Sequence, residues 1–392
     1  MLIEIHMLQN HSPSNLNRDD TGSPKEAVFG GFKRARISSQ CIKRSIRRSN
    51  TFREKLDGHL AARTRRLPEL VRDRLLKEGI SPEMAEVAAK KASGFGTEAG
   101  KEQSDLKTAQ TMFLTDSDIS AVAQVMKEAA AEAGTVAKFE KIAAADLQKS
   151  AQLKGYRPMT VDIALFGRMI TSEAFRDCEA SAQVAHAIST HKVDHEFDYF
   201  TAVDDLKDRT NVEEDAGADM IGDVEFNSAC YYKYFSIDFD GLVDNLTGVS
   251  AGRKDISDAE RNEALDLALK TVDAFIQTAA MTTPSGKQNT FAAHQLPSMI
   301  YVELRQHKTP VNYANAFVQP AKQSAGTDLI QDSIAKFKAH VGAMTRGFNL
   351  EAAGRFVLAP EVAEFKIEGL DVEKVTDLNA LCSRVKEVIA NG

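Results

Sequence analysis

The chain has 392 residues, 43% hydrophobic and 27% charged, which is enough to bury a large core and excludes a disordered chain. Its formal net charge of −7, taken alone, argues against a nucleic-acid binder. The four cysteines lie far apart without a C-x-x-C pair, which argues against a disulfide framework or structural zinc and favours a reducing compartment.

Neither the hydropathy nor the first residues indicate a membrane or secreted protein. No apolar run is long enough to span a bilayer, and residues 1–6 lack the basic and apolar regions of a signal peptide. We therefore expect a cytoplasmic protein without membrane contact.

The N-terminal region is predicted to be a strand followed by a polar loop. Residues 2–8 alternate apolar and polar side chains, as a strand does, and residues 11–20 are rich in turn formers. The loop leads into residues 29–48, which hold no acid and seven cations: Lys33, Arg34, Arg36, Lys43, Arg44, Arg47 and Arg48.

Residues 38–48 predict a helix with a basic outer face. Ser38 or Ser39 can cap its N-terminus. Like charges four residues apart, as in Lys43 with Arg47, cost about a few tenths of a kcal/mol in an isolated helix, so the pattern favours an external anion such as phosphate. A solvated basic face is the alternative. At 3.6 residues per turn the polar face carries Gln40, Lys43, Arg44, Arg47 and Arg48.

The distribution of charge supports a polyanion partner despite the acidic total. Residues 33–77 hold 15 Lys and Arg against four acids, a balance of +11, so the rest of the chain carries −18. Such segregation makes one face attractive to a polyanion while the whole protein stays acidic.

The middle of the chain is predicted to be a helical insertion followed by a return to core-like sequence. Residues 55–155 are rich in Ala, Glu and Lys and carry no strand pattern. Residues 161–166 then predict a strand, Gly167-Arg168-Met169 a turn, and residues 180–188 a short helix.

Two extended arms around a polar tip predict a long β-hairpin. Residues 198–203 are apolar and aromatic, and residues 213–219 form an acidic tip rich in Gly and Ala. Phe200, Met220 and Ile221 have no obvious core to join. A hairpin folded back onto its own domain is the alternative.

Strands and helices alternate in the remaining sequence. Without the insertion and the hairpin, the predicted order is β-α-β-β-α-β, the ferredoxin-like α+β arrangement that RNA-recognition folds use. The further predicted strands are residues 224–239 and 298–304, and the further predicted helices start at the capping box of residues 257–260 and cover residues 328–341 and 372–389.

No motif for a cofactor, a metal or a catalytic nucleophile is present. The chain lacks a phosphate loop, G-x-S-x-G, H-E-x-x-H and a dinucleotide fingerprint. His186, His191 and His195 are close in sequence, but no carboxylate or cysteine spacing supports a metal site there. Asp204 and Asp205 suit either a metal pair for phosphodiester cleavage or a surface acidic edge.

Three stretches together resemble a known family. On these stretches the chain closely resembles the CasC backbone subunits of type I-E CRISPR Cascade surveillance complexes, which belong to the RAMP superfamily. The match extends along most of the chain, although the helical insertion matches in kind more than in residues. The stretches are residues 11–20 with 29–31 and 36–40, Gly167-Arg168-Met169, and residues 198–205 with 225–228.

The resemblance implies a hand-shaped α+β protein: a ferredoxin-like, RNA-recognition-like palm with a helical insertion as fingers and a β-hairpin as thumb. Several copies would polymerise head to tail along one guide (CRISPR) RNA, and each thumb would displace one base at a regular interval. The other bases would stay displayed for target DNA, together with other Cascade subunits and a recruited helicase-nuclease that cuts. No catalytic role, cofactor or metal is expected. The parts are palm at 1–54, 156–194 and 227–392, fingers at 55–155, and thumb at 195–226.

The resemblance also assigns RNA contacts to matching positions. Met169 would pack against a base, and Phe200, with Tyr199, Thr201 and Ile221, would form the thumb wedge. The acidic residues 213–219 depart from the pattern, because RNA would repel them. The predicted phosphate contacts on the palm are Arg18, Ser38, Gln40, Lys43, Arg44 and Arg47.

Two other functions remain as alternatives. An RNA-processing endonuclease on the same fold would use a general base, for which His11 beside the basic stretch is the candidate. A small-molecule enzyme with an anionic substrate is the second alternative, although the chain carries no cofactor motif for it.

Overall fold

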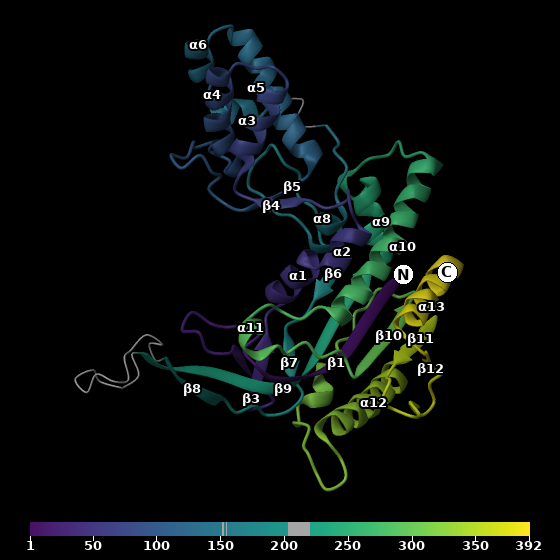
Figure 1. The fold of residues 1–392 in the computed structure, drawn as a ribbon. Helices are drawn as coiled ribbons and strands as arrows, with labels where there is room; N and C mark the ends of the chain where they lie inside the picture. The colour runs from purple at the N-terminus through teal and green to yellow at the C-terminus, as the bar shows by residue number, and fades with distance from the viewer. Residues whose placement is uncertain (151–152, 154, 203–219) are drawn as a thin grey trace, which may run out of the picture. The chain divides into compact units, whose positions relative to one another are not determined.

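The computed structural model describes residues 1–150, 153, 155–202 and 220–392 (Figure 1). Backbone contacts divide the described chain into two compact units. The sheet unit comprises Met1–Phe52, Val184–Ser236 and Asp273–Gly392, and the helical unit comprises Arg53–Gln183 and Ile237–Val272. Each unit is thus assembled from segments that are far apart in the sequence.

The sheet unit is built on a sheet of ten strands. Eight strands follow the order β12-β11-β10-β1-β9-β7-β3-β2, while β6 and β8 pair with β9 outside this order. The strands are β1 (Leu2–Ser14), β2 (Glu26–Phe29), β3 (Phe32–Ile37), β6 (Ala182–Val184), β7 (Ala187–Ser189), β8 (Glu196–Ala202), β9 (Met220–Asp238), β10 (Met299–Arg305), β11 (Gly354–Leu358) and β12 (Glu373–Lys374).

The four central strands have a ferredoxin-like arrangement. They follow one another in the chain as β1, β7, β9 and β10 but lie in the sheet as β10-β1-β9-β7. In the sequence, α1 (Ser39–Arg48) lies between β1 and β7, and α10 (Asp258–Met281) lies between β9 and β10. This order agrees with the predicted β-α-β-β-α-β, although its second strand is β7 rather than residues 161–166, and the α+β fold class is confirmed.

An aromatic core covers one side of these strands. It is formed with α12 (Leu329–Phe348) and the 3-10 helix Tyr313–Phe317, while α13 (Leu378–Asn391) lies against β11 (Figure 1). The buried aromatic side chains of this core are Tyr232, Tyr234, Tyr301, Tyr313, Phe317, Phe337 and Phe365.

Buried charges cross the same core. Arg305 Nη1 lies 2.9 Å from Glu4 Oε2, and Arg305 Nη2 donates to Glu303 Oε2 at 2.7 Å. Arg355 Nε donates to the other oxygen of Glu303 at 2.8 Å, and Tyr234 OH donates to Glu4 Oε1 at 2.7 Å. Removing one partner of a buried ion pair is strongly destabilising, so this network links the four neighbouring strands β11, β10, β1 and β9 in one register.

The helical unit has a core of its own. Leu75, Phe95, Met126 and Phe139 are buried in it. A two-stranded sheet of β4 (Ala62–Thr64) and β5 (Met112–Leu114) accompanies the helices. The helices that lie wholly or partly in this unit are α2 (Asn50–Lys55), α3 (Leu67–Lys77), α4 (Pro82–Ala92), α5 (Asp116–Ala133), α6 (Val136–Glu140), α7 (Ala144–Gln148), α8 (Val161–Phe166), α9 (Phe239–Thr247) and the first part of α10.

Several secondary-structure predictions are wrong. Residues 11–14 continue β1 rather than a loop, the predicted helical insertion contains the strands β4 and β5, and the helix predicted over 372–389 begins only at Leu378. Residues 161–166 form α8 rather than a strand. Nearly all side chains of this segment are buried, and a short apolar run does not reveal whether its hydrophobic period is that of a helix or of a strand. Asp162 in its first turn and Gly167 at its end, with φ of +80°, are helix start and stop features. Residues 180–188 contain β6 and β7 rather than a helix, because Ile188 pairs with Tyr232 of β9.

In the part of the chain that is described, no helix combines the length and the apolar character needed to cross a membrane.

The buried carboxylate of Glu4 predicts a pH-dependent stability. Burial raises its pKa to about 7, although Arg305 lowers it. Because the folded pKa lies above the ordinary 4.5, the folded state binds this proton more tightly, and its contribution to the free energy of unfolding is lost as the pH rises through 7. We predict that Glu4→Gln removes a decline of up to about 3 kcal/mol between roughly pH 4.5 and 8, measured by urea unfolding.

The exposed carboxylate Glu361 provides the control. Glu361→Gln should leave the pH profile of the wild type unchanged. A Glu4→Gln profile that runs parallel to the wild type would contradict the assignment.

Candidate nucleic-acid interface

The basic helix α1 is held at its N-terminus by the polar loop before it. Ser38 is the cap, as predicted, because its hydroxyl accepts a hydrogen bond from Cys41 N at 3.3 Å. The Asn17 side chain accepts from Ser38 N at 2.8 Å, so Arg18, the next residue, lies beside this end of the helix. Ile42 and Ile46 are buried beneath α1. The opposite face of α1 is therefore turned outward.

The outward face of α1 presents most of the predicted phosphate contacts. Gln40 and Arg44 are exposed, while Lys43 and Arg47 are half-buried. Burial lowers the pKa of Lys43 from its ordinary value. No acidic residue lies in the first turn of α1. The free N–H groups at the helix N-terminus and the side-chain cations therefore both attract an anion.

Three cations of the basic stretch lie outside this face. Arg34 is fully buried and donates to the carbonyls of Ser189 at 3.2 Å and Phe317 at 2.7 Å. Lys33 lies 3.4 Å from Glu26, and Arg36 donates to the Glu26 carbonyl at 2.9 Å. None of these three was among the predicted phosphate contacts, and the structure places them on β3, where they bind within the sheet unit.

Arg18 belongs to an exposed loop with a shallow hollow. The loop is closed by a bridge between Arg18 and Pro24 and by Asp19, whose carboxylate accepts from Thr21 N and Ser23 N, each at 3.0 Å. Residues 16–22 and Gly286 line a space of about 490 Å³. A Cβ on Gly286 would lie 2.5 Å from the Leu16 carbonyl oxygen, so this close contact of two loops requires glycine.

The predicted thumb arms form a two-stranded ribbon, β8 with the first part of β9 (Figure 1). Every residue of β8 is exposed, including Tyr199 at 66%. Phe200 and Ile221 are 37% and 61% exposed. The tip residues 203–219, which include Asp204, Asp205 and the acidic stretch 213–219, lie outside the described residues.

The pairing separates the predicted wedge residues onto two faces. Thr201 is opposite Ile221, and Tyr199 is opposite Asp223, so these side chains share one face. Phe200 is opposite Gly222 on the other face, and a Cβ on Gly222 would lie 2.7 Å from the Phe200 ring. The predicted wedge residues therefore lie on both sides of the ribbon, Phe200 on one face and Thr201 with Ile221 on the other, because successive strand residues point to opposite sides.

The base of the ribbon is fixed to the sheet unit. His195 bonds Glu225 through Nδ1 and lies 2.8 Å from Glu26 through Nε2. The Asn15 side chain donates to the Glu225 carbonyl at 2.8 Å. The ring of Phe226 lies 5.4 Å from that of Phe291 in α11 (Gln288–Phe291). These contacts hold the ribbon where it leaves the sheet.

Met169 lies in the helical unit and is 89% exposed. Its neighbour Arg168 is buried and donates to Asp118 Oδ2 at 2.6 Å, and Arg157 donates to Asp118 Oδ1 at 2.8 Å. The Asp118 side chain also accepts from Thr115 N at 3.1 Å as part of a capping box that starts α5. Asp118 thus fixes the turn that exposes Met169. Its role was not predicted from the sequence, although the pattern T-x-x-D before an apolar run is a signal for it.

His11, the candidate catalytic residue, is buried, and the three histidines considered for a metal site each contact another group of the protein. His11 is fully buried, and burial lowers its pKa to about 4, so it is a neutral group away from solvent. His191 accepts a hydrogen bond from Cys230 N at 3.2 Å, and His186 lies 3.1 Å from Arg36. Among the described residues, no three or more His, Cys, Asp or Glu side chains are grouped as metal ligands.

Comparisons with known proteins give a consistent result. A family model described as "CT1975-like protein" matches residues 3–384. None of the curated proteins matches this chain. A solved chain from a "CRISPR RNA-guided surveillance complex, pre-nicking" is 27% identical, with both chains covered at 100% and a TM-score of 0.80. A chain from a "CRISPR RNA-guided surveillance complex" is 22% identical with the same coverage and a TM-score of 0.59, which shows the fold alone.

The buried position of Asp118 predicts a large effect on stability. Asp118→Asn would leave Arg168 and Arg157 without their anion, and breaking a buried pair in this way costs about 3–5 kcal/mol. We expect a decrease of this order in the free energy of unfolding, measured with urea. Asp116→Asn, which removes an exposed partner of Arg74 in the same helix turn, should cost about 0–1 kcal/mol. Equal decreases in the two variants would contradict the structural role of Asp118.

Proposed function

Because this chain belongs to the CT1975-like protein family, we propose that it is a guide-RNA-binding subunit of a CRISPR RNA-guided surveillance complex. More narrowly, we propose a backbone subunit of the type I-E Cascade class, corresponding to CasC. It would polymerise head to tail on CRISPR RNA and display the RNA to invading DNA in antiviral and antiplasmid defence. The full-length likeness to a subunit from such a complex supports the broader assignment.

The exposed ribbon is the observation that carries the proposal. An isolated two-stranded ribbon is marginally stable in water, and the described part of this one exposes apolar or aromatic side chains on both faces. Unstacked bases provide flat apolar surfaces for such side chains. A ribbon inserted between two bases can use both faces at once, Phe200 on one side and Thr201 with Ile221 on the other.

The cations of α1 account for the other half of RNA binding. Arg44, Lys43 and Arg47 would contact phosphates, and Ser38 and Gln40 would contact the same backbone near the helix N-terminus. Arg18 would add a contact from the adjacent loop. Such contacts are independent of sequence, which suits a protein that accepts any guide and leaves recognition to base pairing. Met169 would pack against a base from the helical unit.

We further propose that the subunit has no catalytic role and needs no cofactor. Its palm, fingers and thumb at the predicted boundaries would only bind, and a recruited helicase-nuclease would cut the target DNA in the cytoplasm. The burial of His11 weighs against the alternative of an RNA-processing endonuclease, because a general base must reach the 2′-OH. Purified protein should leave labelled repeat RNA intact.

The proposal is tested by producing the chain with a guide RNA and the other subunits. A backbone subunit should elute as a large assembly with a high ratio of absorbance at 260 to 280 nm. Sequencing the bound RNA should give guide and repeat sequence. A chain that elutes alone and free of RNA under these conditions would contradict the proposal.

We predict that removing cations from α1 weakens RNA binding equally for unrelated guides. For Arg44→Gln with Arg47→Gln, the slope of log affinity against log salt should fall by about one unit for each phosphate that the variant no longer neutralises. Arg261→Gln, an exposed cation of the helical unit, is the control for net charge and should keep the wild-type slope. An unchanged slope in the α1 variant would exclude a role for these two arginines in phosphate binding.

We predict that the two ribbon faces act together in displacing bases. Phe200→Ala and Ile221→Ala should each weaken assembly on RNA by about tenfold, since a stacked aromatic contributes about 1–3 kcal/mol and burial of an aliphatic side chain about 1.5–3 kcal/mol. In the assembled complex, the double variant should no longer show the regular spacing of bases that react with chemical probes. Gly222→Ala keeps every wedge side chain but displaces the Phe200 ring, so it should resemble Phe200→Ala. Regular spacing that persists in the double variant would assign the displacement to another element.

A further inference from the structure

The N-terminus of α1 is completed by a side chain from outside the helix. Ser38 is the N-cap, and its own N–H donates to Asn17 Oδ1 at 2.8 Å. In a complete capping box, this N–H is bound by the side chain three residues after the cap. That position is Cys41 here, and a thiol is only a weak acceptor. Asn17, which precedes the cap by 21 residues, therefore supplies the acceptor that the helix itself lacks.

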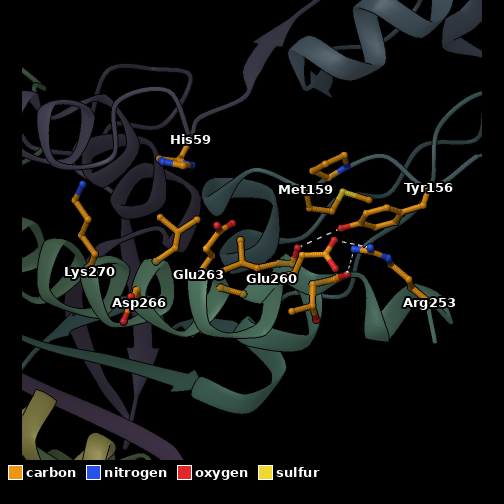
Figure 2. A pocket seen from close by; sticks show the side chains of 13 residues that line it. His59, Tyr156, Met159, Arg253, Glu260, Glu263, Asp266 and Lys270 are labelled. Atoms are coloured by element: carbon orange, nitrogen blue, oxygen red, sulfur yellow. Dashed lines mark hydrogen bonds and ion pairs between the residues drawn. The ribbon is translucent and has the colours of Figure 1, made fainter. Parts of the chain in front are cut away.

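Two helices of the helical unit show how a complete box differs. Asp118 of α5 and Glu260 of α10 accept from the backbone N–H three residues earlier, at 3.1 Å and 2.9 Å. Each of these carboxylates is matched by an arginine, because Arg168 donates to Asp118 and Arg253 donates to Glu260 (Figure 2). At α1 the acceptor is a neutral amide, and the first turn contains no acid. The positive end of α1 is thus capped without a carboxylate.

Asn17 is held in place by contacts within the sheet unit. Its carbonyl accepts from Lys25 N at 2.8 Å. The fully buried Asn15 donates from its amide nitrogen to the Gly22 carbonyl at 2.9 Å and to the Glu225 carbonyl at 2.8 Å. Glu225 lies at the base of the ribbon, so the same short segment holds the end of α1 and the place where the ribbon leaves the sheet.

The neutral amide is the weaker choice for the helix and the better choice for an anion. A carboxylate at this position would bind the Ser38 N–H more strongly, and a negative charge at a helix N-terminus stabilises the helix. The same charge would repel a phosphate that approaches the free N–H groups and the cations of α1. Helix stability and phosphate binding therefore place opposite demands on Asn17.

We propose that Asn17 is a positioning residue for RNA binding. Its amide fixes the N-terminus of α1 next to the ribbon base and keeps this end of the helix open to a phosphate of the RNA. Asn17 itself acts through the Ser38 N–H and does not need to touch the RNA. The inference rests on the proposed function, because it requires the guide RNA to be bound at α1.

Two substitutions of Asn17 separate a positioning role from a purely structural one. The free energy of unfolding, measured with urea, should fall in Asn17→Ala and should equal or exceed the wild-type value in Asn17→Asp. Affinity for guide RNA, measured with the other subunits present, should instead be lowest in Asn17→Asp. We expect a loss of about tenfold there, with a slope of log affinity against log salt that is smaller by up to about one unit. A purely structural residue would give affinities in the order of the stabilities.

Two controls define the cause of the effect. Gln323→Glu adds the same charge at an exposed position of the sheet unit and should keep the wild-type affinity and slope. In the Arg18→Gln background, Asn17→Asp should still weaken binding, and an effect that disappears there would assign it to neutralisation of Arg18 and overturn the inference. Wild-type affinity and slope in Asn17→Asp would overturn it as well. A wild-type chain that binds no guide RNA would instead contradict the proposed function.

Discussion

The backbone pairing of β9 is the constraint on which the sheet unit depends. Its buried part lies between β1 and β7, while its first residues pair with β8 in the exposed ribbon. Tyr232 of this strand is in the aromatic core, and Ile221 of the same strand is exposed. Because one strand contributes to both places, the buried sheet determines the direction in which the ribbon leaves it. The contacts of His195 and Asn15 with Glu225 reinforce that direction at the junction.

The cations of this protein fall into an exposed group and a buried group, and the sequence pattern does not distinguish between them. Arg44 is exposed on α1, whereas Arg34, in the same basic stretch, is buried and binds carbonyl oxygens. Arg168 and Arg305 are likewise buried, each against carboxylates. A net balance of charge along the chain therefore overstates the surface available to RNA. The segregation of charge remains, but α1 and the Arg18 loop carry it in the sheet unit.

The sequence was sufficient for local and periodic features and insufficient for those set by distant contacts. Alternation predicted β1, strand-forming residues predicted β9, and the cap at Ser38 predicted the start of α1, whereas the central strand β7 was predicted to be part of a helix. The exposure of Phe200 and Ile221 followed from apolar residues with no core, but their opposite faces required the register with β9. The burial of Arg34 and the partners of Asp118 depend on segments far away in the chain, which no local pattern contains. Residues 161–166 were predicted wrongly because a fully buried short segment has no polar face to mark its period.

The separation of Phe200 from Thr201 constrains how a ribbon of this kind can change in length. Side chains alternate along a strand with a period of two, so deleting one residue from β8 would move every later side chain to the other face. Phe200 would then leave Gly222, whose missing side chain provides the space for its ring. Deletion of a residue pair would shorten the ribbon but keep each face intact. Among functional relatives, insertions and deletions in this arm should therefore occur in even numbers of residues.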